Sequence, residues 1–171
     1  MNPRNWSAVE RAMQLSPLLG RKMVGAFLRL ASPFNAPLRA SVDAWEPTTC
    51  RIRVPNRRPL HNHLGGIHAC ALATAGETAA GLMLLRSFPL SRYRLILKDL
   101  SISFERQARS DLVAAATQTH ADWARVQAGL DGGEAQLVPL ETRISEPSGE
   151  RLAVVRTTWQ VKAWDQVRTQ A

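Results

Sequence analysis

Cysteine and long apolar runs are scarce in this sequence, and each shortage excludes a class of protein. The 171 residues contain two cysteines, Cys50 and Cys70, at no spacing typical of a metal or redox site. We therefore expect both to be small buried residues in a reducing compartment, the cytoplasm. No apolar run reaches the roughly 18 residues that a membrane-spanning helix needs, and the N-terminus has no signal-peptide cleavage motif. These features predict a soluble protein.

Acidic residues are also in the minority, with 14 Asp and Glu against 22 Lys and Arg, which gives a formal charge of +8. Such a balance first suggests a nucleic-acid partner. The basic residues are, however, scattered through presumed strands, and no basic motif interleaved with aromatic residues is present. We therefore expect no nucleic-acid partner. A dispersed basic surface suits a smaller polyanion equally well, or simply keeps the surface solvated.

Hydrophobic periodicity divides most of the chain into predicted elements. Apolar residues recur near helical spacing between Trp6 and Ala31, where Pro17 is expected to separate two helices. The segment 106–111 is expected to turn one strand back toward the next. Alternation predicts strands over 38–44, 49–54, 93–106, 112–120, 137–146 and 151–164. Helical patterns predict a central helix over 69–85 and a short one over 122–130.

One very apolar helix and six strands joined by short connections indicate an α+β fold. Short connections favour antiparallel pairing, and a helix with so little polarity must be buried on most of its sides. We expect a curved antiparallel sheet of about six strands wrapped around this long central helix. Residues 37–171 would form that domain, and residues 1–36 would be an N-terminal helical extension packed on it.

The central helix carries a single carboxylate, Glu77, within the sequence ACALATAGETAAGLMLL of residues 69–85. Burying an unpaired carboxylate costs several kcal/mol or makes it take up a proton, and lone buried carboxylates are often catalytic. The alternative is a structural hydrogen bond to the sheet or a solvated helix face. Among these, we favour catalysis or ligand contact.

A polar, glycine-containing loop, Asn62–His68, precedes the N-terminus of this helix. Unpaired backbone N–H groups at a helix start can stabilise a developing negative charge. Loop and carboxylate together therefore suggest an acyl-transfer site. Asn62 is equally suited to capping the loop or the helix, because asparagine favours turns and N-caps.

The stretch Asn62–Glu77 resembles the signature of hotdog-fold acyl-CoA thioesterases of the phenylacetate-pathway type. It is most similar to the subgroup described as domain of unknown function 4442 (DUF4442), in which an extra helix precedes the first strand. The resemblance implies a hotdog fold, an acyl-CoA or related thioester as substrate, and no cofactor other than the coenzyme A of that substrate. It also implies a homodimer, or a dimer of dimers, with sites at the dimer interface.

Site roles follow from the same resemblance. Glu77 would be the nucleophile or the general base that activates water, Asn62 would position that water or the carbonyl, and the Ala69 N–H would lie in the oxyanion hole. His68 would shape the loop. The sequence departs from the family pattern at Ala69 and Cys70, where glycines are common, so a non-catalytic acyl-CoA or fatty-acyl binding protein is the alternative.

Helix geometry adds an independent requirement. Ala69 and Glu77 are eight residues apart, which at about 1.5 Å per residue separates them by roughly 12 Å along the axis. One reacting carbonyl cannot contact both groups of the same helix. The two groups must therefore come from antiparallel helices of two subunits, and the mechanism requires a dimer.

The remaining candidates concern charge, metal and the N-terminal helices. We expect no metal, although His61, His63 and His68 lie near Glu77 in the sequence. The N-terminal helices would cover the acyl pocket, pack on the sheet edge or rest on an anionic membrane surface, and we favour the first. Four arginines either bind the phosphates of coenzyme A or are surface residues: Arg57, Arg58, Arg106 and Arg109.

Overall fold

The computed structural model describes residues 16–117 and 122–167 of the chain. Its helices are α2 (Pro17–Ala31), α3 (Ala69–Ser87) and α4 (Trp123–Asp131), with 3₁₀ helices at Pro33–Leu38, Arg58–Leu60 and Trp164–Gln166. Its strands are β1 (Ser41–Glu46), β2 (Thr49–Val54), β3 (Tyr93–Phe104), β4 (Leu112–Thr117), β5 (Gln136–Ser145) and β6 (Arg151–Ala163). The first of the two predicted N-terminal helices lies outside the described residues.

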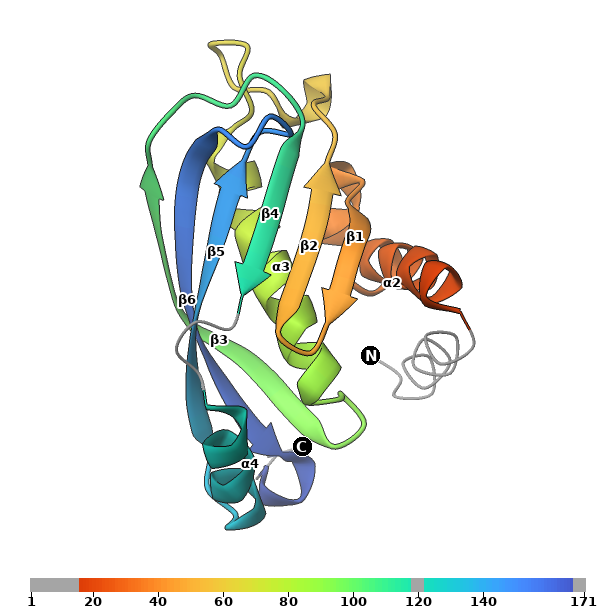
Figure 1. The fold of residues 1–171 in the computed structure, drawn as a ribbon, viewed down its shortest axis with the longest axis vertical. Coiled ribbons are helices and arrows are strands. Elements are labelled where there is room, and N and C mark those ends of the chain that lie inside the picture. Colours follow the sequence, from red (N-terminus) through yellow and green to blue (C-terminus); the bar gives the residue numbers. More distant parts are fainter. Residues whose placement is uncertain (1–15, 118–121, 168–171) are drawn as a thin grey trace.

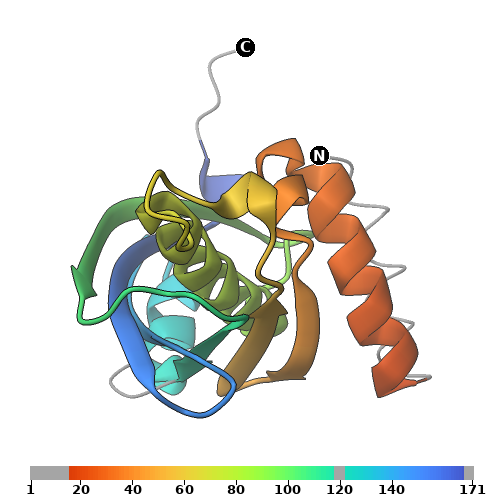
Figure 2. The ribbon, with the colours of Figure 1, turned by 90° about the horizontal axis from the view of Figure 1, so that it is seen from above.

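The six strands form one antiparallel sheet in the order β1-β2-β4-β5-β6-β3. The sheet curves around α3, while α2 lies outside this wrap beside β1 (Figures 1 and 2). This confirms the predicted α+β hotdog architecture with an N-terminal helix packed against it. β1 and β3 are the two edges of the sheet, so each has one side without a strand partner among the described residues.

Small residues on α3 allow the strands to approach it closely. A Cβ placed on Gly76 would lie 2.6 Å from the Cβ of Val155, so β6 leaves no room for a side chain at this position. The buried Thr142 hydroxyl donates a hydrogen bond to the Gly76 carbonyl at 3.1 Å, and Trp45 Nε1 donates to the Leu82 carbonyl at 2.7 Å. The helix is therefore held by polar contacts as well as by apolar packing.

Two expectations about local structure are wrong. The segment 106–111 does not join neighbouring strands, because β3 pairs with β6 while β4 lies between β2 and β5. Figure 1 shows this connection crossing the open end of the sheet. The first strand begins at Ser41 rather than at 38, because Pro33–Leu38 forms a 3₁₀ helix that ends at Arg39 in the left-handed conformation (φ 45°).

Packing of α2 against the sheet rests on one side of the helix. Val24 is fully buried, whereas Lys22 and Arg29 are exposed. The Ser16 hydroxyl caps the helix by accepting a hydrogen bond from the Leu19 N–H. No helix of the described segments is long and apolar enough to cross a membrane.

The tight contact at Gly76 predicts a position-specific loss of stability. Gly76→Ala forces a methyl group into Val155, and overpacking of this kind lowers the free energy of unfolding by about 1–3 kcal/mol. Gly25→Ala is the matched control, because a Cβ there meets its nearest neighbour at an ordinary 3.5 Å and an alanine inside a helix is favoured over glycine. Urea denaturation measures both changes, and a Gly76→Ala protein as stable as Gly25→Ala would contradict the packing described.

Candidate active site

Glu77 lies at the middle of α3 and is half-buried. It borders a cleft of about 200 Å³ between α3 and α2, in which Phe27 and Leu28 of α2 face Gly81 and Leu85 of α3. Glu77, Gly81 and Leu85 are spaced four residues apart, so they lie along one side of the helix. The cleft therefore extends from the carboxylate along α3 and is mostly apolar.

Burial dominates the electrostatics of this carboxylate. The described residues that line the cleft include no arginine, lysine or histidine, and Glu77 has no hydrogen bond or ion pair with a described residue. Desolvation therefore raises the pKa of Glu77 above its usual value of 4.5. A carboxylate with a raised pKa accepts a proton more readily than an exposed one.

The N-terminus of α3 offers a free backbone donor. His68 is the N-cap residue, and its Nδ1 accepts a hydrogen bond from the Cys70 N–H at 3.1 Å. The His68 N–H itself donates to the Leu60 carbonyl, and the Ala71 N–H donates to the His68 carbonyl. Within the described segments no acceptor is found for the exposed Ala69 N–H. The geometry thus leaves one helix-terminal N–H available to a ligand.

Asn62 has a structural role and still retains a donor. Its Oδ1 accepts hydrogen bonds from the N–H groups of Leu64 at 2.9 Å and Gly66 at 3.2 Å, which fixes the loop before α3. Gly66 is required there, because a Cβ would lie 2.9 Å from the Ala108 carbonyl oxygen. The Asn62 Nδ2 group makes no hydrogen bond to any described residue. Loop capping therefore leaves the amide nitrogen free for a substrate oxygen.

Asn62 and Ala69 border a different pocket from that of Glu77. This pocket, of about 330 Å³, also touches Phe104 at the end of β3 and Arg106, and it shares no lining residue with the Glu77 cleft. The structure thus brings Asn62 and Ala69 together, but it does not bring Glu77 to them within one chain. The eight intervening residues of α3 keep them about 12 Å apart along the helix axis.

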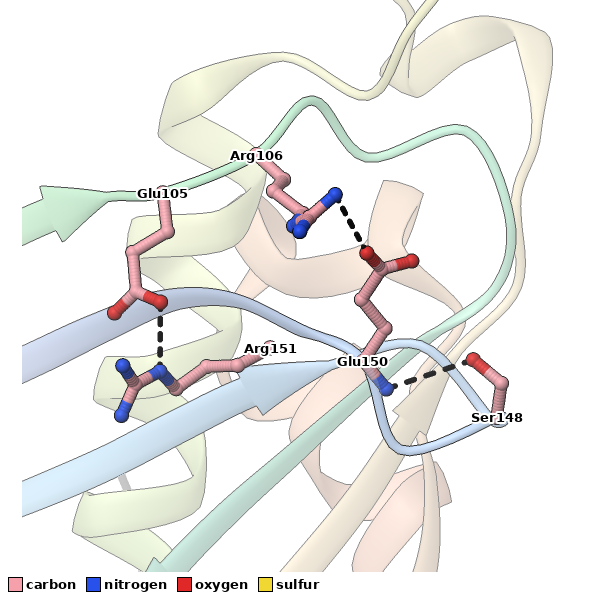
Figure 3. Close-up of polar contacts among 5 residues, drawn as sticks. All are labelled: Glu105, Arg106, Ser148, Glu150 and Arg151. Atoms are coloured by element: carbon pink, nitrogen blue, oxygen red, sulfur yellow. Dashed lines mark hydrogen bonds and ion pairs between the residues drawn. The ribbon is translucent and has the colours of Figure 1, made fainter.

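Of the four predicted phosphate-binding arginines, Arg106 lies at the pocket of Asn62 and Ala69. Its side chain forms an ion pair with Glu150 at 2.8 Å, next to an Arg151–Glu105 ion pair at 2.7 Å (Figure 3). Arg109 donates to the side-chain oxygen of Gln107, which also lines this pocket. Arg57 donates to the Pro37 carbonyl at 3.3 Å, and Arg58 is exposed.

The cysteines and the histidine His61 lie in unrelated environments. Cys50 is buried, and desolvation raises its pKa to about 12. Cys70 is exposed in the first turn of α3, so the prediction that it is buried is wrong. His61 Nε2 lies 2.6 Å from Asn56 Oδ1. Across residues 16–117 and 122–167, no group of three or more His, Cys, Asp or Glu side chains could hold a metal ion.

Sequence reasoning missed the residues that shape the Glu77 cleft. Trp159 of β6 forms part of its wall, and a Cβ added at Gly81 would lie 3.2 Å from the Trp159 ring. Gly81 follows Glu77 by four residues on a predicted helix, so its place on the same side of the helix as Glu77 could have been predicted. The contribution of Phe27 and Leu28 to the cleft could not be predicted from the sequence, because it depends on how α2 packs against the rest of the fold.

This chain matches a protein family and is similar to one related sequence and to several solved structures. Residues 20–161 match the family described as a domain of unknown function (DUF4442). A Halobacterium salinarum protein named as a candidate esterase is 30% identical over 131 residues, which cover 72% of this chain and 81% of that protein. A Pseudomonas aeruginosa structure described as a protein of unknown function and candidate thioesterase has a TM-score of 0.73 at 23% identity, covering 83% and 95% of the two chains. A Staphylococcus aureus thioesterase has a TM-score of 0.65 at 17% identity, covering 77% and 99%.

Burial of Glu77 predicts how stability depends on pH. Because its folded pKa is raised, the folded protein binds more protons than the unfolded chain between pH 4.5 and the raised value, and stability falls as the pH rises through this window. Glu77→Gln removes the free-energy cost of ionising a buried carboxylate, so we expect the variant to be more stable than the wild type at pH 7. The difference should vanish below pH 4.5.

Urea denaturation between pH 4 and 8 measures this difference. Glu134→Gln, at an exposed turn, controls for the loss of one negative charge. A Glu77→Gln protein that is less stable than the wild type at neutral pH would show that the carboxylate is held by a favourable contact.

Proposed function

Since the chain belongs to the DUF4442 family, we propose that it hydrolyses the thioester bond of an acyl-CoA. The observation that carries the proposal is the desolvated Glu77 at an apolar cleft, on a helix whose first N–H is unpaired and lies beside Asn62. Carboxylate, backbone donor and amide are the groups that thioester hydrolysis requires. The alternative, a non-catalytic acyl-CoA or fatty-acyl binding protein, uses the same cleft without the chemistry.

The raised pKa of Glu77 supports a role as general base. The carboxylate would take a proton from water while the water oxygen forms a bond to the thioester carbonyl carbon. When the carbon–sulfur bond then breaks, the proton passes to the departing thiolate of coenzyme A, which leaves as the free thiol. Direct attack by the carboxylate on the carbonyl is the other route, and it would give an anhydride intermediate that water hydrolyses.

The oxyanion would be stabilised at the start of α3. The Ala69 N–H lies at the positive end of the helix dipole, and a backbone donor does not depend on the side chain. The free Nδ2 of Asn62 is a second donor at the same pocket. His68 supports both by capping the helix. Ala69 in place of glycine therefore narrows the pocket without removing the donor.

The spacing of the two side chains gives further support. Two structures of the Staphylococcus aureus thioesterase are variants in which alanine replaces a glutamine in one and a glutamate fifteen positions further along in the other. Asn62 and Glu77 stand at the same spacing here. A carboxamide followed fifteen positions later by a carboxylate thus occurs in both chains.

A second copy of the chain would complete the site through the open edge of β3. Leu95 of β3 borders the Glu77 cleft, and Phe104 of the same strand borders the pocket of Asn62 and Ala69. Antiparallel pairing of two β3 strands centred between Asp99 and Leu100, one residue past the middle of the strand, would place Leu95 of one protomer opposite Phe104 of the other. The Glu77 cleft of one protomer then meets the Ala69 pocket of the other. The same pairing sets the two α3 helices antiparallel.

The shape of the cleft indicates an apolar acyl group. It follows α3 from Glu77 to Leu85, which is about 12 Å of helix, and Phe27 and Trp159 contribute to its walls. A chain or ring lying there would remove apolar surface from water without burying a charge. Arg106 is the predicted phosphate-binding residue that borders the other pocket, and Arg57, Arg58 and Arg109 complete the proposed set for the phosphates of coenzyme A.

Replacement of Glu77 tests the chemistry. If the carboxylate is the general base, Glu77→Gln lowers kcat for acyl-CoA hydrolysis by about 10²–10⁴-fold, because glutamine keeps the shape but cannot take the proton. Release of free thiol from a panel of acyl-CoAs measures the change. Glu134→Gln is the matched control and should retain wild-type activity.

The same panel separates the enzyme from the binding protein. A wild-type protein that binds acyl-CoA without releasing thiol would support the binding alternative. Thiol release that survives both Glu77→Gln and Glu77→Ala would exclude chemistry at Glu77.

Mixing two inactive variants tests the shared site. In a mixture of Glu77→Gln and Asn62→Asp protomers, half of the dimers are mixed, and each mixed dimer contains one intact site out of two. Hydrolysis should therefore return to about one quarter of the wild-type rate if the site is built across a two-fold axis. Asn62→Asp keeps the oxygen that holds the loop and loses the Nδ2 donor.

The mixed dimers are made by unfolding the two variants and refolding them together. Each variant refolded alone is the control, and it should show no recovery of hydrolysis. A mixture that stays inactive while forming mixed dimers would contradict a site shared between protomers.

A further inference from the structure

A basic groove lies at the sheet edge opposite β3. Its volume is about 750 Å³, and it runs between α2 and the β1–β2 hairpin. One carboxylate, Asp43, is among its lining residues. Six cationic side chains line it: Arg21, Lys22, Arg29, Arg39, Arg51 and Arg53. The described residues that line the groove therefore carry five positive charges in excess.

The single carboxylate neutralises little of this charge. Asp43 forms an ion pair with Arg53 at 3.2 Å, and Arg21 donates to the backbone carbonyl of Asp43, so these contacts position two of the arginines. The other four cations, Lys22, Arg29, Arg39 and Arg51, form no hydrogen bond or ion pair with the residues that the structure describes. Their charges are open to a ligand.

Local structure explains why these side chains converge. Along β2, Cys50, Ile52 and Val54 are buried against the core, so the alternate residues Arg51 and Arg53 point to the outer face of the sheet. On α2, Gly25 lines the groove, and the Arg29 Nη1 lies 3.8 Å from where its Cβ would be. Because Gly25 has no side chain, the groove stays open next to the Arg29 guanidinium.

We propose that this groove binds a soluble organic polyphosphate of the nucleoside diphosphate or triphosphate class. Guanidinium groups bind phosphate oxygens in a bidentate manner, and several unpaired cations facing one cavity repel one another unless an anion lies between them. The volume is within the range of small-molecule sites. None of the described residues that line the groove is aromatic, which disfavours the base stacking used to bind single-stranded nucleic acid.

This site is separate from the proposed catalytic groups. It shares no lining residue with the Glu77 cleft or with the pocket of Asn62 and Ala69. α2 contributes to both the groove and the Glu77 cleft, through Arg29 in one and Leu28 in the other. The ligand is either a free nucleotide or the nucleotide portion of coenzyme A, since both present the same phosphate chemistry. The second source would replace Arg57, Arg58, Arg106 and Arg109 as the binding residues for the coenzyme A phosphates.

Calorimetric titration of the full chain with ATP tests the proposal. Arg29→Glu and Arg51→Glu should each weaken binding by tenfold or more. Arg125→Glu is the matched control, because Arg125 lies on α4 at the far end of the molecule (Figure 1) and is exposed. It should bind within twofold of the wild type. Binding should also weaken as salt rises, because it depends on charge.

Competition by coenzyme A and by pantetheine, which lacks the nucleotide, identifies the source of the phosphates. Displacement of ATP by coenzyme A alone assigns the groove to the nucleotide of coenzyme A, and failure of both to compete assigns it to a free nucleotide. Binding that weakens equally in Arg125→Glu, absence of binding to ATP and coenzyme A, or association with anionic vesicles alone would overturn the proposal. None of these outcomes depends on hydrolysis, so they do not test Glu77.

Discussion

The constraint on which this structure depends is the enclosure of α3 by a curved sheet. A helix can be surrounded in this way only if its residues are apolar and, at the closest approach, small, as Gly76 is against Val155. Its polar backbone must also be satisfied, and Thr142 and Trp45 supply hydrogen bonds to α3 carbonyl groups. Within such an environment a carboxylate loses hydration without gaining a partner. The raised pKa of Glu77 follows from this burial, to which α2 contributes as well as the sheet.

The same helix determines where the other groups of the site lie. Its N-terminus emerges at the rim of the sheet, where the loop held by Asn62 leaves the Ala69 N–H exposed. Because the helix is rigid, the distance from Ala69 to Glu77 is fixed at about 12 Å along the axis. No side-chain movement can close that gap within one protomer. Self-association is therefore part of the proposed chemistry, and β3, which borders both pockets, is the edge that would carry it.

Patterns that are local in the sequence predicted most of the fold. The bounds of α3 and the alternation in β2, β5 and β6 were readable because burial imposes a period on neighbouring residues. The connection between β3 and β4 was misjudged, since strand pairing is decided by how all six strands enclose α3. Cys70 was expected to be buried because cysteine usually is, but at this position the first turn of the helix faces outward. For the candidate site, Asn62, Ala69 and Glu77 were proposed from the sequence, whereas the cleft walls from α2 and β6 were not.

The clustering of basic residues could not be seen in the order of the sequence. The basic residues look dispersed along the chain, yet α2, the segment after it and β2 bring six of them to one groove. Like charges at this spacing oppose the docking of α2 on the sheet, and Val24 with the Arg21 contact to Asp43 must outweigh that repulsion. An anion in the groove would offset it and favour the docked helix. Since Phe27 and Leu28 of this helix cover the Glu77 cleft, the dehydration of the carboxylate would then depend on charge at the opposite face of α2.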